Sequence, residues 1–194
     1  MVDDMHLTSG FELTTAITNV FIFIVSIYGF FKIKNNTLWK LFYLFVAIDS
    51  FLETIIHGLI MTISANIILW LILAIFFTLT INTFLIIFLD YKIKHLFIFS
   101  ILLSILMLVE IHFGLNFILT FTLYVLLALI ICTYKIIKSN KNSKKYFLLG
   151  ITSQFIGGII MLSKLELSYL NHNGLYHIFM VLSMLLFLAG IKKE

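Results

Sequence analysis

Three ionisable residues form one column in a long apolar stretch of the chain. The stretch runs from Leu38 to Met61, and Asp49, Glu53 and His57 occur in it at positions i, i+4 and i+8. On a helix this spacing places the three side chains on one face. An ionisable group that faces hydrocarbon costs at least ~3 kcal/mol, so we expect this face to meet protein, water or an ion.

A second set of polar residues opens the last apolar stretch, which begins NHNGLYH and supplies His172 and His177. His57 and His177 are predicted to lie at similar depth on two helices, where they can offer two imidazoles to one zinc ion, with His172 as a further ligand. Glu53 can then act as a ligand, as an acceptor for an imidazole N–H, or as a general base on a bound water.

The same residues also allow a purely structural interpretation, and the sequence leaves both open. Asn173 is a good helix N-cap residue, so part of the NHNG segment fits a helix start. Glu53 and His57 can form a private i, i+4 pair that holds a neighbouring helix.

Asp49 is the second catalytic candidate, as a group that binds a proton or the substrate. Asn82 or Gln154 could equally satisfy its carboxyl group. Glu110 and His112 fit a solvated loop, and the sequence does not settle their role.

The composition indicates an integral membrane protein. Hydrophobic residues make up 62% of the 194 residues, charged residues 11%, and the mean hydropathy is +1.14. A soluble domain of this composition would have too little polar surface for water. The single cysteine, Cys132, excludes an intrachain disulfide and a four-thiolate metal site.

Seven segments are long and apolar enough to cross a bilayer, which predicts an all-α bundle of seven transmembrane helices in a single domain, residues 1–194. The shortest segment, the fourth, spans only when its charged ends are included. The predicted spans are 13–31, 38–61, 67–89, 95–112, 115–133, 146–163 and 175–190.

Lysine placement supports this count and orients the chain. Twelve of the thirteen lysines fall in alternate loops or in the C-terminal tail, and only Lys164 lies on the other side. The positive-inside rule then places the N-terminus outside and the C-terminus in the cytoplasm. The net charge of +4 thus reflects topology, and no nucleic acid is expected. Trp39 and Trp70 lie near the ends of their spans, where interfacial anchors occur.

The chain lacks the signature residues of several functional classes of membrane protein. The last segment contains no lysine for a retinal Schiff base, and the chain contains no HExxH motif. Neither Ser153 nor Ser163 has the setting of a rhomboid-type nucleophile. No inverted repeat or broken helix indicates a transporter.

A histidine in the second helix and a histidine pair at the seventh resemble the pattern of the CREST superfamily, which includes the alkaline ceramidases and the progestin/adipoQ receptors. The resemblance implies an intramembrane zinc site with His57, His177 and His172 as ligands, and hydrolysis of a lipid amide or ester. The family's helix-two SxxxH is Glu53-x-x-x-His57 in this chain, and its helix-seven HxxxH becomes a pair five residues apart. The family's helix-three aspartate has no counterpart.

The chain also resembles an uncharacterised group of small bacterial seven-helix membrane proteins. The likeness covers Leu38-Trp39 through His57-Gly58 and a last helix with Asn173-x-x-Tyr176-His177. It implies a multi-pass protein of the bacterial inner membrane.

The sequence therefore predicts a metal-dependent intramembrane hydrolase of a lipid amide or ester, with zinc as cofactor and membrane lipids as partners. The alternative is a non-catalytic sensor, receptor or small-ligand binding protein with a structural polar network. The substrate and the oligomeric state stay open.

Overall fold

The chain folds as an all-α bundle. A computed structural model describes residues 12–89, 98, 100–106, 109 and 117–193. Over these residues it contains seven helices, one of which is represented by the helical residues 100–106. The other helices are α1 (Leu13–Lys32), α2 (Thr37–Gly58), α3 (Ile63–Leu89), α5 (Phe117–Lys138), α6 (Lys144–Ser163) and α7 (His172–Ile191).

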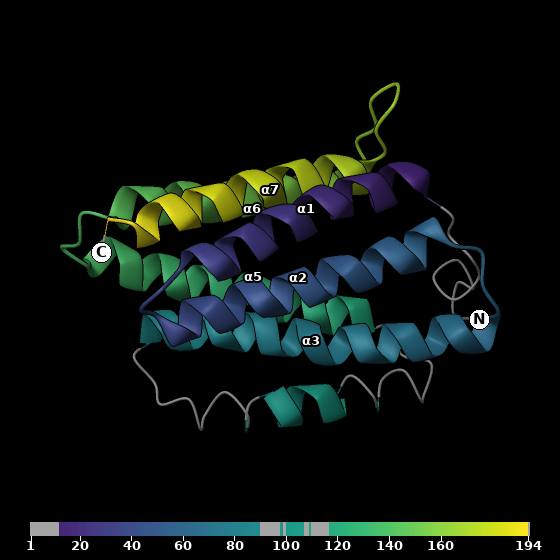
Figure 1. The fold of residues 1–194 in the computed structure, drawn as a ribbon, viewed down its shortest axis with the longest axis horizontal. Helices are drawn as coiled ribbons and strands as arrows, with labels where there is room; N and C mark the ends of the chain where they lie inside the picture. Colours follow the sequence, from purple (N-terminus) through teal and green to yellow (C-terminus); the bar gives the residue numbers. More distant parts are fainter. Residues whose placement is uncertain (1–11, 90–97, 99, 107–108, 110–116, 194) are drawn as a thin grey trace.

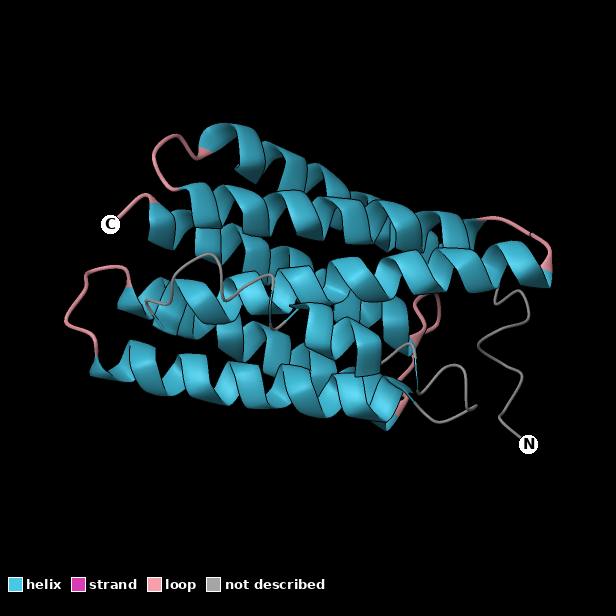
Figure 2. Ribbon diagram, turned by 90° about the horizontal axis from the view of Figure 1, so that it is seen from below, coloured by secondary structure: helices cyan, strands magenta, loops and turns pink. Residues whose placement is uncertain are grey.

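The helices run along one long axis (Figures 1 and 2). α1 packs against both α2 and α7, α6 packs against α7, and α3 packs against the other side of α2. α1 and α7 begin at the same end of the bundle, and α2 ends there. The side chains of Glu53 and His57, from α2, and of His177, from α7, therefore lie at the end of the bundle where α1, α2 and α7 meet.

Five helices are long and apolar enough to cross a membrane: α1, α2, residues Ser64–Leu89 of α3, α6 and α7. They correspond to five of the seven predicted spans. Half of the predicted span 95–112 falls outside the described residues. The orientation of the termini stays a prediction.

Helix α1 shows how the bundle divides polar from apolar residues. Its exposed face carries large apolar side chains, namely Ile17, Phe21, Ile24 and Tyr28. Its buried face carries the polar residues Thr15, Thr18, Asn19 and Ser26. This arrangement is the inverse of a helix on a water-soluble protein. It suits a lipid surround, since polar side chains in membrane helices face the bundle interior.

An aromatic core fills the end of the bundle away from the histidines. Trp39 is only 1% exposed, and its ring stacks on Phe147 with centroids 5.4 Å apart and an interplanar angle of 9°. Gly150 and Gly190 leave room for the neighbouring phenylalanine rings, because a Cβ at either position would overlap one of them. The prediction that Trp39 is an interfacial anchor is therefore wrong.

Candidate functional site

Three helix ends meet at the site. The backbone N–H of Glu12, just before α1, donates to the carbonyl oxygen of His57 near the end of α2 at 2.9 Å. The Asn171 side chain caps α7 by accepting from the Gly174 N–H at 2.8 Å. The prediction that Asn173 is the N-cap is wrong by two residues, because α7 begins at His172. The bond between Glu12 and His57 thus ties the start of α1 to the end of α2.

The Glu12 carboxylate joins the first turns of α1 and α7. One of its oxygens accepts from the Thr15 hydroxyl at 2.6 Å, from the Asn171 amide at 2.9 Å and from the Asn173 amide at 3.1 Å. Burial alone would raise the pKa of Glu12. The three hydrogen bonds and the nearby His57 ring outweigh burial, so the pKa of Glu12 lies below its ordinary value of 4.5. Glu12 is thus an ionised group at neutral pH.

The pair formed by His177 and Glu53 is the centre of the site. The His177 Nε2 atom lies 3.7 Å from Glu53 Oε2, and the two side chains are only 6% and 18% exposed. On the other side of the ring, Nδ1 lies 3.0 Å from the Thr18 hydroxyl. The prediction placed Glu53 and His177 near one another, and the structure brings them together.

The Thr18 hydroxyl determines what His177 presents to Glu53. It has one proton for several acceptors, because two backbone carbonyl oxygens lie 2.9 and 3.0 Å from it, as well as His177 Nδ1. If Thr18 donates to a carbonyl, it accepts from Nδ1–H, and the Nε2 lone pair then faces the Glu53 carboxyl. If Thr18 donates to Nδ1, Nε2–H faces Glu53 at a distance too long for a good hydrogen bond. Both states leave hydrogen-bonding capacity unused between the imidazole and the carboxyl group.

Asn19 adds further unused hydrogen-bonding capacity beside the Glu53 carboxyl group. Its side chain is fully buried, at 0% exposure, and lies next to the Glu53 carboxyl group. Within the part of the chain that the structure describes, neither the nitrogen nor the oxygen of this amide makes a hydrogen bond of good geometry. An unsatisfied buried polar group costs about 1–3 kcal/mol, and proteins usually place a water, an ion or a ligand at such a group. We call Thr18, Asn19, Glu53 and His177 the His–Glu site.

His57 borders the His–Glu site without completing a metal site. The centroid of the His57 ring lies 6.3 Å from that of the Trp70 ring of α3, with the two rings edge-on. His57 also lies within electrostatic range of Glu12 and His177. Over residues 12–89, 100–106 and 117–193, no three His, Cys, Asp or Glu side chains are close enough to hold one metal ion. Because a catalytic zinc takes three protein ligands, the described residues do not assemble that site, and zinc stays a prediction.

Asp49 belongs to a different contact. One of its carboxyl oxygens accepts from the Thr80 hydroxyl of α3 at 2.6 Å. Asn82, one of the partners considered for it, instead donates to Ser100 at 3.0 Å and accepts from the Tyr124 hydroxyl. The structure thus places Asp49 at the α2–α3 interface rather than between α1, α2 and α7.

His172 lies on a different face of α7 from His177. Its Nδ1 atom lies 3.5 Å from Glu166, in the loop between α6 and α7. Five residues along a helix correspond to roughly 500°, which leaves His172 about 140° away from His177 around α7. His6, His95, Glu110 and His112 lie outside the described residues.

The sequence interpretation missed Glu12, Thr18 and Asn171. A signal for two of them was present, because Glu12, Thr15 and Thr18 follow one another at intervals of three at the start of an apolar segment. A polar row of this kind at the start of a predicted span indicates a buried helix face.

A family model described as "Family of unknown function (DUF6962)" matches residues 14–194. No curated protein and no solved structure matches the chain. The matched residues include all four members of the His–Glu site.

Proposed function

Because the chain belongs to the Family of unknown function (DUF6962), whose description states no activity, we propose its function from the His–Glu site. The protein is a multi-pass membrane protein that binds one small polar ligand between α1, α2 and α7. In the orientation expected from the lysines, this end of the bundle faces outward, in the bacterial inner membrane.

The buried amide of Asn19 is the observation that supports this proposal most strongly. Asn19 offers two donor hydrogens and one acceptor oxygen beside Glu53, and neither end of the amide makes a hydrogen bond of good geometry among the described residues. A purely structural network would pair these atoms, because each unpaired group destabilises the fold. A ligand that satisfies them explains why polar groups persist at a buried position.

The side chains of the His–Glu site define the chemical class of this ligand. Glu53 offers carboxyl oxygens, Asn19 offers an amide oxygen, and His177 can offer an Nε2 lone pair. The ionised Glu12, hydrogen-bonded to Asn171 at the same end of the bundle, adds negative charge. An N–H donor matches these acceptors, so the favoured ligand carries an amine or amide group, either as a free small molecule or on a lipid headgroup.

Native mass spectrometry of the full-length protein, purified from membranes in a mild detergent, tests this proposal. The wild-type protein should retain one non-protein mass per chain, and Glu53→Gln should lose it. Lys135→Gln, at the other end of the bundle, is the control and should retain it. A bare wild-type protein whose melting temperature is raised by neither ethanolamine nor an N-acyl ethanolamine would refute the proposal.

A metal-dependent hydrolase is the second candidate, and the orientation of His177 favours it. Ligand histidines in metal sites have their second nitrogen fixed by a hydrogen bond, and Thr18 fixes Nδ1 of His177 while Nε2 faces Glu53. In this version His57 and His177 would hold the metal, which would supply a Lewis acid, and Glu53 would lie beside it as a general base. Elemental analysis separates the two candidates, since the hydrolase requires stoichiometric metal that both His57→Ala and His177→Ala lose.

A further inference from the structure

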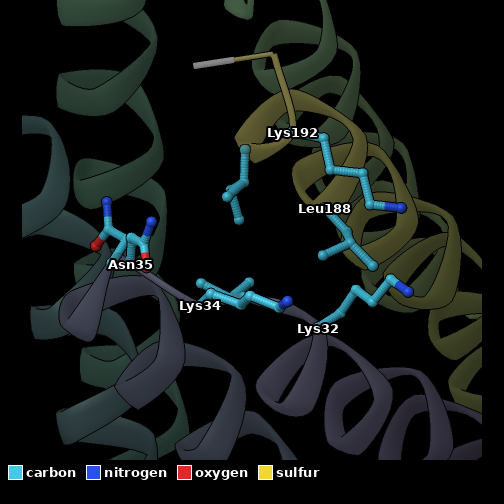
Figure 3. A pocket seen from close by; sticks show the side chains of 8 residues that line it. Lys32, Lys34, Asn35, Leu188 and Lys192 are labelled. Atoms are coloured by element: carbon cyan, nitrogen blue, oxygen red, sulfur yellow. The ribbon is translucent and has the colours of Figure 1, made fainter.

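A basic pocket lies at the opposite end of the bundle, between the turn that joins α1 to α2 and the last turn of α7. Its volume is about 380 Å³, within the roughly 300–1,000 Å³ typical of small-molecule sites. Figure 3 shows Lys32, Lys34 and Lys192 around this hollow, together with Asn35 and Leu188. This basic pocket is separate from the His–Glu site and does not depend on the function proposed for it.

The lining of the basic pocket combines positive charge with an apolar floor. Three of its eight lining residues are lysines, and none of the eight is acidic. Leu188 and Ile33 are buried and form the apolar part of the lining. Asn36 uses its side-chain oxygen to accept from the backbone N–H at the start of α2, at 3.2 Å, which leaves its amide hydrogens as donors.

We infer that the basic pocket binds a phosphate-bearing anion. Ammonium groups and amide N–H donors match phosphate oxygens, and basic pockets between helices on the lysine-rich side of membrane proteins take lipid headgroups. The positive-inside rule explains why lysines gather at this end, but it requires neither a hollow nor an apolar floor. The shared chemistry has two sources, an anionic phospholipid headgroup or free phosphate.

The test uses the full-length protein in a neutral detergent and follows the melting temperature during titration with phosphatidylglycerol, phosphatidylcholine or inorganic phosphate. The pocket variant combines Lys34→Gln with Lys192→Gln. The control variant combines Lys135→Gln with Lys138→Gln, which removes the same charge from the last turn of α5. Both lysine pairs are exposed. Without ligand, the two variants should therefore melt at the same temperature as the wild type, which verifies that they fold.

Phosphatidylglycerol should stabilise the wild-type protein, and the pocket variant should need roughly 30-fold more lipid for half the effect, since it lacks two lysines that line the pocket, each worth about 1 kcal/mol toward the bound headgroup. The control variant should change by less than about threefold, because neither of its lysines lines the pocket. Stabilisation by phosphatidylglycerol alone identifies a lipid headgroup as the source, and stabilisation by inorganic phosphate as well supports recognition of phosphate itself. The inference is overturned if both variants need more phosphatidylglycerol by the same factor, or if neither variant needs more. It is also overturned if phosphatidylcholine stabilises the wild type as well as phosphatidylglycerol does, or if no phosphate compound stabilises the wild type.

Discussion

Replacing Asn19 with leucine distinguishes a ligand site from a structural network by the sign of its effect on stability. In the ligand-free protein the Asn19 amide is buried without a hydrogen bond of good geometry among the described residues. Leucine has a similar shape and no polar atoms. Asn19→Leu should therefore stabilise the ligand-free protein while it removes ligand binding.

The magnitude follows from the two unsatisfied atoms of the amide, the nitrogen and the oxygen. Each costs about 1–3 kcal/mol when buried. Leucine removes both costs, but it also takes the amide away from the neighbouring Glu53 carboxyl, which offsets about one of them. The net gain is about 1–3 kcal/mol, or roughly 3–10 °C in melting temperature for a chain of this length.

Thermal unfolding of ligand-free protein in detergent, followed by tryptophan fluorescence, measures this difference. Asn82→Leu is the matched control, since the Asn82 amide is equally buried but is hydrogen-bonded to Ser100 and Tyr124. It should lower the melting temperature by a comparable amount, because it breaks hydrogen bonds and leaves polar partners buried. If Asn19→Leu lowers the melting temperature as much as the control does, Asn19 belongs to a structural network and the reasoning fails.

Three further predictions concern stability, each measured by thermal unfolding in detergent. Because the folded pKa of Glu12 lies below 4.5, its contribution to stability is present above that value and is lost as the pH falls through the folded pKa. Glu12→Gln should cost about 1 kcal/mol at pH 7 and should make stability fall less steeply at acid pH. An unchanged fall in stability at acid pH contradicts the reasoning. Thr80→Val removes the hydrogen bond to the buried Asp49 carboxyl and should cost about 1–3 kcal/mol; a neutral effect would mean that Asp49 is satisfied elsewhere. Gly150→Ala places a methyl group against a phenylalanine ring and should cost about 1–3 kcal/mol. In Gly158→Ala the new methyl group enters open space, so this variant should be neutral or stabilising by up to ~1 kcal/mol. Equal effects of the two variants on stability would refute the packing argument.

The sequence located the centre of the site because helical spacing and depth are local properties. Glu53 and His57 lie one turn apart on α2, and the start of α7 brings His177 to the same end of the bundle. The roles of Thr18 and Asn19 depend on how α1 rotates against α2 and α7, which spacing within one segment does not determine. The partner of Asp49 depends in the same way on α3.

Two errors have the same physical origin, because they concern contacts between distant segments. Trp39 has the position of an interfacial anchor, but Phe147 covers its ring from a helix more than a hundred residues away. Asn173 suits an N-cap, but Asn171 takes that role, and the Asn173 amide turns to Glu12 at the other end of the sequence. Local preference is overridden when a distant residue offers a better contact.

An experimental density map of the protein purified from membranes tests the central claim most directly. The account predicts non-protein density between the Asn19 amide, the Glu53 carboxyl group and Nε2 of His177, within hydrogen-bond distance of each. An empty site, in which the Asn19 amide and His177 bond directly to Glu53, would contradict the account.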